Sequence, residues 1–214
     1  MKQTLTALAC LLVIGGATAK QPNILILYAD DLGFGDLGCY YENSKIPTPN
    51  LNELAKESVR FTDGHSSSGI CTPSRFAMLT GRYHWRDFHG IVNVFGDSVF
   101  KLERLTLPEM LKEKGYATAA IGKWHLGWDW SAIRNKEGQL GPEAFDWSKS
   151  IPNGPLAHGF DYYFGATVIN CPPYCWIDND KVVMPCFLYP SDAADVPLRF
   201  HLPSSGRQLT NYHI

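Results

Sequence analysis

Apolar runs of strand length recur in the amino-terminal half of the chain. Residues 23–28, with the sequence NILILY, form a continuous apolar run, which is typical of a parallel strand buried on both faces. Shorter runs at residues 59–62 and 116–121 have the same character. The pattern predicts a strand at each of these places.

Segments with helical signals lie between these runs. The first begins at Thr48 and Pro49, the second covers residues 72–80, and the third covers residues 106–114. The residues that mark faces and ends are Leu51, Leu54 and Ala55 in the first helix, Pro73 and Gly81 in the second, and Thr106, Glu109 and Gly115 in the third. This alternation indicates an α/β fold with a mostly parallel central sheet flanked by helices.

The first 19 residues differ from the rest. Lys2 precedes an apolar run over residues 5–14, which leads to small residues ending in Ala19. This order is that of a secretory signal peptide cleaved after Ala19. A membrane-spanning helix needs about 20 apolar residues, so no stable membrane span is expected. The sequence therefore predicts export, to the periplasm or the extracellular space.

Composition narrows the class of function. The chain has 214 residues, of which 45% are hydrophobic and 19% charged, enough for one sizeable core. A formal net charge of -2 gives no electrostatic footprint for nucleic acid or for an anionic membrane surface. We therefore expect a small-molecule ligand and no nucleic-acid partner.

Five cysteines remain after removal of the leader: Cys39, Cys71, Cys171, Cys175 and Cys186. An odd number in an oxidising compartment leaves at least one unpaired or used for other chemistry. The spacing of Cys171 and Cys175 is that of half a zinc site, but no second pair with suitable spacing follows. Buried thiols or one local disulfide are the preferred interpretation, and the pairing stays open.

Two polar clusters follow predicted strands. ADDLGFGDLG follows residues 23–28, and GKWHLGWDW begins after residue 121. Both lie at carboxyl ends of strands, where open α/β sheets bind ligands. Asp30 and Asp31 are hard oxygen donors suited to calcium or magnesium, although a solvated turn is the ordinary alternative.

Cys71 is set among hydroxyls, glycine, proline and arginine instead of an apolar neighbourhood. It falls at the amino end of the predicted helix over residues 72–80, where free N–H groups and a partial positive charge favour an anion such as sulfate or phosphate. Arg75, Lys123 and His125 add donors. Together with a dication, these groups can hold an oxyanion ester at a nucleophile and stabilise the developing charge.

These segments carry a resemblance to a known family. GICTPSRFAMLTGR is similar to the sulfatase signature built on C-x-P-S-R, and GYATAAIGKWHLG is similar to the second sulfatase signature. The resemblance covers Pro22 to about Val183 and implies an alkaline-phosphatase-like fold. It includes the opening stretch NILILYADDLGFGDLGCYY, then HGFDYYFG, and then PPYCWIDND, which is seen especially in bacterial carbohydrate sulfatases.

The resemblance implies a modified nucleophile and a metal. In sulfatases the cysteine of C-x-P-S-R is oxidised by a maturing enzyme to formylglycine, so Cys71 would become an aldehyde that hydrates to a geminal diol. One hydroxyl would attack sulfur, and loss of the proton from the other would release sulfate. By the same resemblance, Asp30, Asp31 and the modified Cys71 would bind calcium, with magnesium as an alternative.

The remaining roles concern the donors around the diol. By resemblance, Arg75 would stabilise the diol, Lys123 would contact diol and sulfate, and His125 would hydrogen-bond the diol and help to move its proton. The expected activity is hydrolysis of a sulfate ester on a sulfated small molecule or glycan, and a carbohydrate is the substrate class that we expect. The rival interpretations are a phosphonate or phosphodiester hydrolase of the same fold, a catalytically silent remnant, and a zinc-binding module.

The last 30 residues, 185–214, depart from the family. Sulfatases run to several hundred residues and carry a later histidine, an Asp-Asn pair and a further lysine. His201 and His213 are candidates for the later histidine by residue type only. We expect a signal peptide over residues 1–19, part of a catalytic domain over residues 20–184, and a divergent tail. Our hypothesis for this tail is a truncated gene product or a frame error. We also expect this chain to be catalytically silent by itself.

Overall fold

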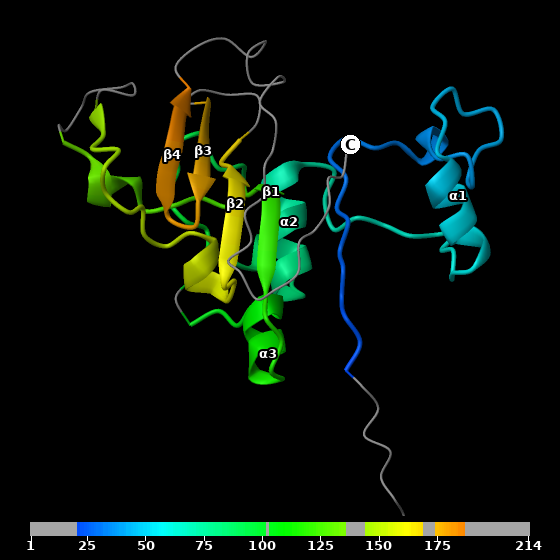
Figure 1. Cartoon of the computed structure of the whole chain (residues 1–214), viewed down its shortest axis with the longest axis horizontal. Helices are drawn as coiled ribbons and strands as arrows, with labels where there is room; N and C mark the ends of the chain where they lie inside the picture. Colours follow the sequence, from blue (N-terminus) through cyan, green and yellow to red (C-terminus); the bar gives the residue numbers. More distant parts are fainter. Residues whose placement is uncertain (1–20, 102, 136–143, 169–173, 187–214) are drawn as a thin grey trace, which may run out of the picture. The chain divides into compact units, whose positions relative to one another are not determined.

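The computed structural model describes residues 21–101, 103–135, 144–168 and 174–186 (Figure 1). It divides into two compact units, Met1–Arg60 and Phe61–Ile214. Each unit is described by itself.

The first unit contains the short 3-10 helix η1, Phe34–Asp36, and the helix α1, Pro49–Lys56. The predicted start of α1 is confirmed. Proline at its first position suits the helix because its missing N–H has no partner to lose there. The hydroxyl of Thr48 accepts a hydrogen bond from the N–H of Gly38 at 3.0 Å, which ties the start of α1 to the preceding loop.

Two predicted strands are wrong. Residues 23–28 form no strand, and Leu25 and Leu27 are 81% and 75% exposed. Residues 59–62 form none either, and the side chains of Val59 and Phe61 are exposed. A strand exists only where a neighbour supplies the ladder hydrogen bonds, and an apolar run does not report whether that neighbour is present.

The second unit begins with helices whose prediction is confirmed. Helix α2 spans Cys71–Thr80 and ends at Gly81, which has φ +65°. The 3-10 helix η2, His84–Arg86, and the helix α3, Leu107–Glu113, follow. The capping box of α3 is formed as predicted, because Glu109 accepts a hydrogen bond from the N–H of Thr106 at 2.7 Å and donates its own N–H to the Thr106 hydroxyl at 3.4 Å.

The sheet of the second unit has the strand order β1-β2-β3-β4. The strands are β1 Ala119–Lys123, β2 Tyr162–Ala166, β3 Tyr174–Asp178 and β4 Lys181–Cys186, with 3-10 helices η3 Trp130–Ile133 and η5 Pro155–His158 between β1 and β2. β1 and β2 are parallel, whereas the pairs β2/β3 and β3/β4 are antiparallel. The α/β class is confirmed, and the described sheet is mixed, as Figure 1 shows.

Strand β1 lies further along the chain than the apolar run 116–121 indicated, because it begins at Ala119 and ends at Lys123. Its register against β2 brings Gly122 opposite Gly165. A Cβ atom at Gly165 would lie 1.9 Å from the carbonyl oxygen of Gly122, so only glycine allows this approach. Tyr163 lies two residues before Gly165 on β2, and its hydroxyl donates a hydrogen bond to the same Gly122 carbonyl oxygen at 3.0 Å.

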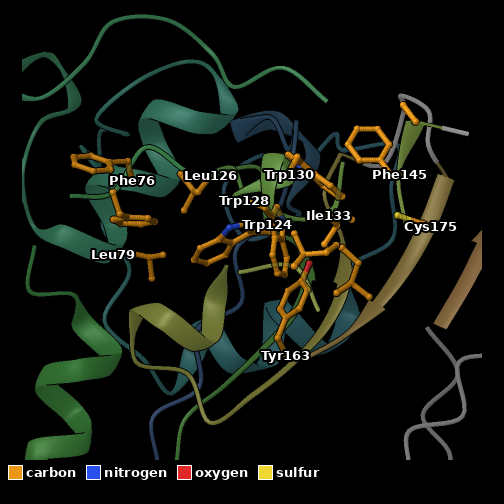
Figure 2. Packing of buried hydrophobic residues seen from close by; sticks show 14 residues of the cluster. Phe76, Leu79, Trp124, Leu126, Trp128, Trp130, Ile133, Phe145, Tyr163 and Cys175 are labelled. Atoms are coloured by element: carbon orange, nitrogen blue, oxygen red, sulfur yellow. The ribbon is translucent and has the colours of Figure 1, made fainter. Parts of the chain in front are cut away.

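The core of the second unit is rich in aromatic rings. Figure 2 shows Trp124, Trp128 and Tyr163 near the centre of the packed cluster. Trp128 and Tyr163 are each 1% exposed, and their ring centroids lie 5.7 Å apart. The segment GKWHLGWDW, interpreted from its polar residues as a site loop, therefore also supplies much of the core. In the described part of the chain, no helix is long and apolar enough to cross a membrane.

Candidate active site

Cys71 occupies the first position of α2, where the helix has N–H groups without partners inside the helix. Its side chain is half-buried and its thiol is free. The flanking Ile70 offers no side-chain cap, so no acceptor of its own closes this helix end. The position suits an anionic or strongly polar group, because the helix dipole adds partial positive charge there.

Strand β1 carries a lysine whose ammonium lies beside the Cys71 side chain. The ammonium of Lys123, the last residue of β1, lies 3.1 Å from the Cys71 sulfur. One turn into α2, the Arg75 guanidinium donates to the main-chain carbonyl of Lys123 at 2.6 Å. The structure thus brings Cys71, Arg75 and Lys123 together. Figure 1 shows the elements that carry them, helix α2 and strand β1, side by side.

His125 lies in the turn after β1 and is held by main-chain groups. Its ring Nε2 is 2.8 Å from the carbonyl oxygen of Val92, and its own N–H donates to the Thr167 carbonyl at 2.9 Å. Its carbonyl accepts from the hydroxyl of Thr72 at 2.9 Å. The side chain of His125 is 5% exposed, and its backbone φ is +53°. Residues other than glycine rarely adopt this backbone conformation, which persists only where the surroundings impose it.

The surroundings that impose it include the segment before β1. The N–H of Trp128 donates to Gly96 at 3.2 Å, and the N–H of Val99 donates to Leu126 at 3.0 Å. Gly127 has φ +84°, and a Cβ there would lie 2.0 Å from the carbonyl oxygen of Asp97. The turn carrying His125 is therefore packed tightly against residues 96–99.

Sequence reasoning missed Thr72 and Val92. Thr72 is fully buried, and its hydroxyl also accepts from the N–H of Val92 at 3.1 Å. Its position next to Cys71 in the sequence could have indicated that it belongs to the site. Val92 takes part through its peptide groups, so its side chain gave none.

Asp30 and Asp31 belong to the first unit, and their side chains are exposed. Asp31 has φ +55°, a left-handed conformation for a residue that is not glycine. Within the described ranges, no group of three or more histidine, cysteine, aspartate or glutamate side chains is arranged to hold a metal ion. The aspartates offer the type of donor expected for calcium.

The described cysteines do not support a zinc site. Cys175 is a buried free thiol, and burial raises its pKa to about 12. A zinc ligand must be a thiolate, which this environment disfavours. Cys39 is also a free thiol, whereas Cys171, His201 and His213 lie outside the described residues, as does the side chain of Cys186.

Comparison with protein families identifies the family of this chain. The family profile named Sulfatase matches residues 22–190 of this chain. The chain belongs to the sulfatase family. Its C-x-P-S-R segment forms the first half of α2, and the strand and turn of its second signature carry Lys123 and His125.

Curated relatives agree with the family assignment. The sulfatase chain is 38% identical over 171 residues to an N-acetylgalactosamine-6-O-sulfatase of Bacteroides thetaiotaomicron, covering 78% of this chain and 31% of the relative. It is 47% identical over 118 residues to human arylsulfatase A, covering 54% of this chain and 23% of the relative. The chain thus spans about a third or less of the length of these relatives.

A solved structure supports the fold. A Bacteroides thetaiotaomicron protein from work on the metabolism of multiple glycosaminoglycans matches with a TM-score of 0.66 and 38% sequence identity. The match covers 77% of the sulfatase chain and 32% of that protein. The α/β arrangement described above is therefore that of a sulfatase.

Proposed function

We propose that the protein carrying this chain hydrolyses a sulfate ester on a carbohydrate, with position 71 as the nucleophile. The observation that supports this most directly is the Lys123 ammonium, 3.1 Å from the Cys71 sulfur at the amino end of α2. A cation and a helix amino end that converge on one side chain favour an anionic group bound there.

Position 71 fits a formylglycine. Cys71 is half-buried at the helix end, beside a lysine instead of within the apolar core that holds Cys175. When formed by a maturing enzyme, formylglycine would supply a hydrated aldehyde. One hydroxyl would attack sulfur and displace the alcohol of the substrate, and loss of the proton from the second would expel sulfate and restore the aldehyde. Lys123 binds the developing negative charge, and Arg75, which donates to the Lys123 carbonyl, fixes the strand end that presents it.

Calcium is the metal that we propose for this site, with magnesium as the alternative. Asp30 and Asp31 are adjacent carboxylates, the hard oxygen donors that these cations take. They and the oxygen-bearing form of residue 71 would hold the ion. Its contribution when bound is to draw charge from the sulfate oxygens.

The carbohydrate substrate is supported by the likeness to the N-acetylgalactosamine-6-O-sulfatase over 78% of this chain. Export to the periplasm or the extracellular space is proposed from the leader-like residues 1–19, which lie outside the described residues. The expected partners are a sulfated glycan and a formylglycine-generating enzyme.

The test is peptide mass spectrometry across residues 66–75 after expression with a formylglycine-generating enzyme. The peptide should show the mass loss of thiol-to-aldehyde conversion and should react with a hydrazide probe. A Cys71→Ala variant should do neither, and the peptide with Cys39 should keep its thiol. An unmodified Cys71 in a host that matures other such motifs would reject formylglycine at this position.

Turnover distinguishes the ester class. The full-length, matured protein should hydrolyse an aryl sulfate faster than an aryl phosphate diester. The opposite preference would favour the phosphodiester hydrolase.

A further inference from the structure

Thr72 is fully buried, and its hydroxyl acts both as a hydrogen-bond donor and as an acceptor. It donates to the carbonyl of His125 at 2.9 Å and accepts from the N–H of Val92 at 3.1 Å. These partners lie 53 and 20 residues away in the sequence, so this one hydroxyl joins three segments of the unit. A threonine whose only task was to start α2 would bond within its own helix turn.

The third side of the arrangement connects Val92 and His125 directly. The carbonyl of Val92 lies 2.8 Å from Nε2 of the His125 ring. A carbonyl oxygen only accepts, so Nε2 must carry the hydrogen. In the neutral ring the lone pair is then on Nδ1, which is the nitrogen able to take a proton.

We propose that Thr72 is a positioning residue for His125, holding the imidazole in the Nε2–H tautomer through Val92. The proposal rests on the proposed function, together with the proton-transfer role at residue 71 that the resemblance implies for His125. The three contacts close a ring: Thr72 to the Val92 N–H, the Val92 carbonyl to the His125 imidazole, and the His125 carbonyl back to Thr72. Since Thr72 is bonded to Cys71, the ring also sets the histidine relative to the nucleophile.

The ring explains the strained backbone of His125. Its φ of +53° turns its carbonyl toward Thr72 while its side chain points to Val92. Removal of the Thr72 hydroxyl leaves a buried carbonyl and the N–H of Val92 without this partner, and buried polar groups do not tolerate that state well. The Val92 peptide should then shift and release the imidazole.

The decisive variants are Thr72→Val, which keeps the shape and removes the hydroxyl, and Thr72→Ser, which keeps the hydroxyl. Thr80→Val is the matched control, because Thr80 lies on the same helix and its hydroxyl bonds only to main-chain groups close in sequence. It donates to the Phe76 carbonyl at 2.7 Å and accepts from the N–H of Arg82 at 3.3 Å. Each is made in the full-length, matured protein. The readouts are kcat and KM for an aryl sulfate and the imidazole nitrogen NMR signals of His125, assigned by their loss in His125→Gln.

We expect Thr72→Val to lower kcat by about 10- to 100-fold with little change in KM, as for other groups that orient a reacting residue. The His125 signals should change from a single Nε2–H tautomer to a mixture. Thr72→Ser should restore both readouts, and Thr80→Val should change neither. Where Thr72→Val does not fold, Thr72→Ala takes its place with the same expectations.

An unchanged tautomer in the valine or alanine variant would overturn the positioning role, even if kcat fell. An unchanged kcat with an altered tautomer would overturn its importance for turnover. Failure of the proposed function has a different signature, because the parent protein would then lack sulfatase activity while the tautomer response to Thr72→Val remained.

Discussion

Arg75 and Lys123 meet at a peptide group. The guanidinium donates to the Lys123 carbonyl, and the ammonium of the same lysine reaches the Cys71 sulfur. A carbonyl is a neutral acceptor, so this hydrogen bond orients Arg75 without cancelling its charge. One cationic side chain therefore contacts Cys71 directly, and a second is held by the main chain of the first, an arrangement that favours a bound anion.

The close approach of β1 and β2 can be tested at a single residue. Gly165→Ala would place a Cβ 1.9 Å from a main-chain oxygen, which cannot move aside as a flexible side chain can. We expect the free energy of unfolding to fall by about 3 kcal/mol or more, the upper range for overpacking. Denaturant titration of the variant measures this loss.

Gly64→Ala is the control, because the nearest atom to its Cβ would be the Cβ of Phe61 at an ordinary 3.8 Å. This variant should remain within about 0.5 kcal/mol of the parent protein, as surface substitutions usually do. Equal losses in the two variants would show that the strand contact is looser than described.

At the scale of elements, short-range signals were predictive. Thr106 and Glu109 marked the start of α3 because their reciprocal hydrogen bonds lie within four residues of the chain. Pro49 and Gly81 marked α1 and α2 for similarly local reasons. Residues 23–28 misled, since a strand depends on distant partners that no local pattern encodes.

In the candidate site too, some residues were predictable from the sequence and others were not. Cys71 and Lys123 were predicted from motifs, and the structure brings their side chains together. Their catalytic roles stay predictions. Val92 was not predictable, because the site uses its peptide N–H and carbonyl, which every residue except proline possesses.

The 3-10 helix η5 gives the second unit a pH dependence. Burial lowers the pKa of its last residue, His158, below the ordinary 6.5, against an opposing effect of the Glu109 charge. The unfolded chain therefore takes up this proton first on acidification. The stability from neutral His158 is complete above pH 6.5 and is lost as the pH falls toward the folded pKa.

We expect the free energy of unfolding to decline as the pH falls below about 6.5, and His158→Gln to flatten that decline because glutamine does not titrate. Urea unfolding at several pH values measures both slopes. His65→Gln, at an exposed histidine, is the matched control and should leave the slope as in the parent protein. A His158→Gln slope equal to that of the parent would contradict the prediction.

At the scale of the whole molecule, the residues predicted from the sequence as site residues fall into two units, each described by itself. Asp30 and Asp31 lie in the first unit, and Cys71, Arg75, Lys123 and His125 in the second. The predicted carboxylate donors thus belong to one unit, and the predicted nucleophile and cationic side chains belong to the other.

The carboxylates can be tested through metal binding, independently of turnover. In the full-length, matured protein, replacing Asp30 and Asp31 together by asparagine keeps their size and removes two negative charges. Calcium affinity, measured by isothermal titration calorimetry, should fall severely. Activity should fall with it.

The control replaces Glu53 by glutamine and Asp63 by asparagine, exposed carboxylates that pair with Lys56 and His65. It removes the same charge and should bind calcium as the parent does. Equal calcium affinity and stoichiometry in the Asp30/Asp31 variant and the parent would show that those aspartates only form a turn.

The use of the Val92 peptide by the site has a practical consequence for protein engineering. Most substitutions at residue 92 would change its side chain while keeping the N–H and the carbonyl that bind Thr72 and His125. Proline is the exception, because its ring removes the N–H. A randomised library at this position would therefore vary the side chain of residue 92 and preserve the anchoring of the imidazole, a freedom that no position contributing through its side chain offers.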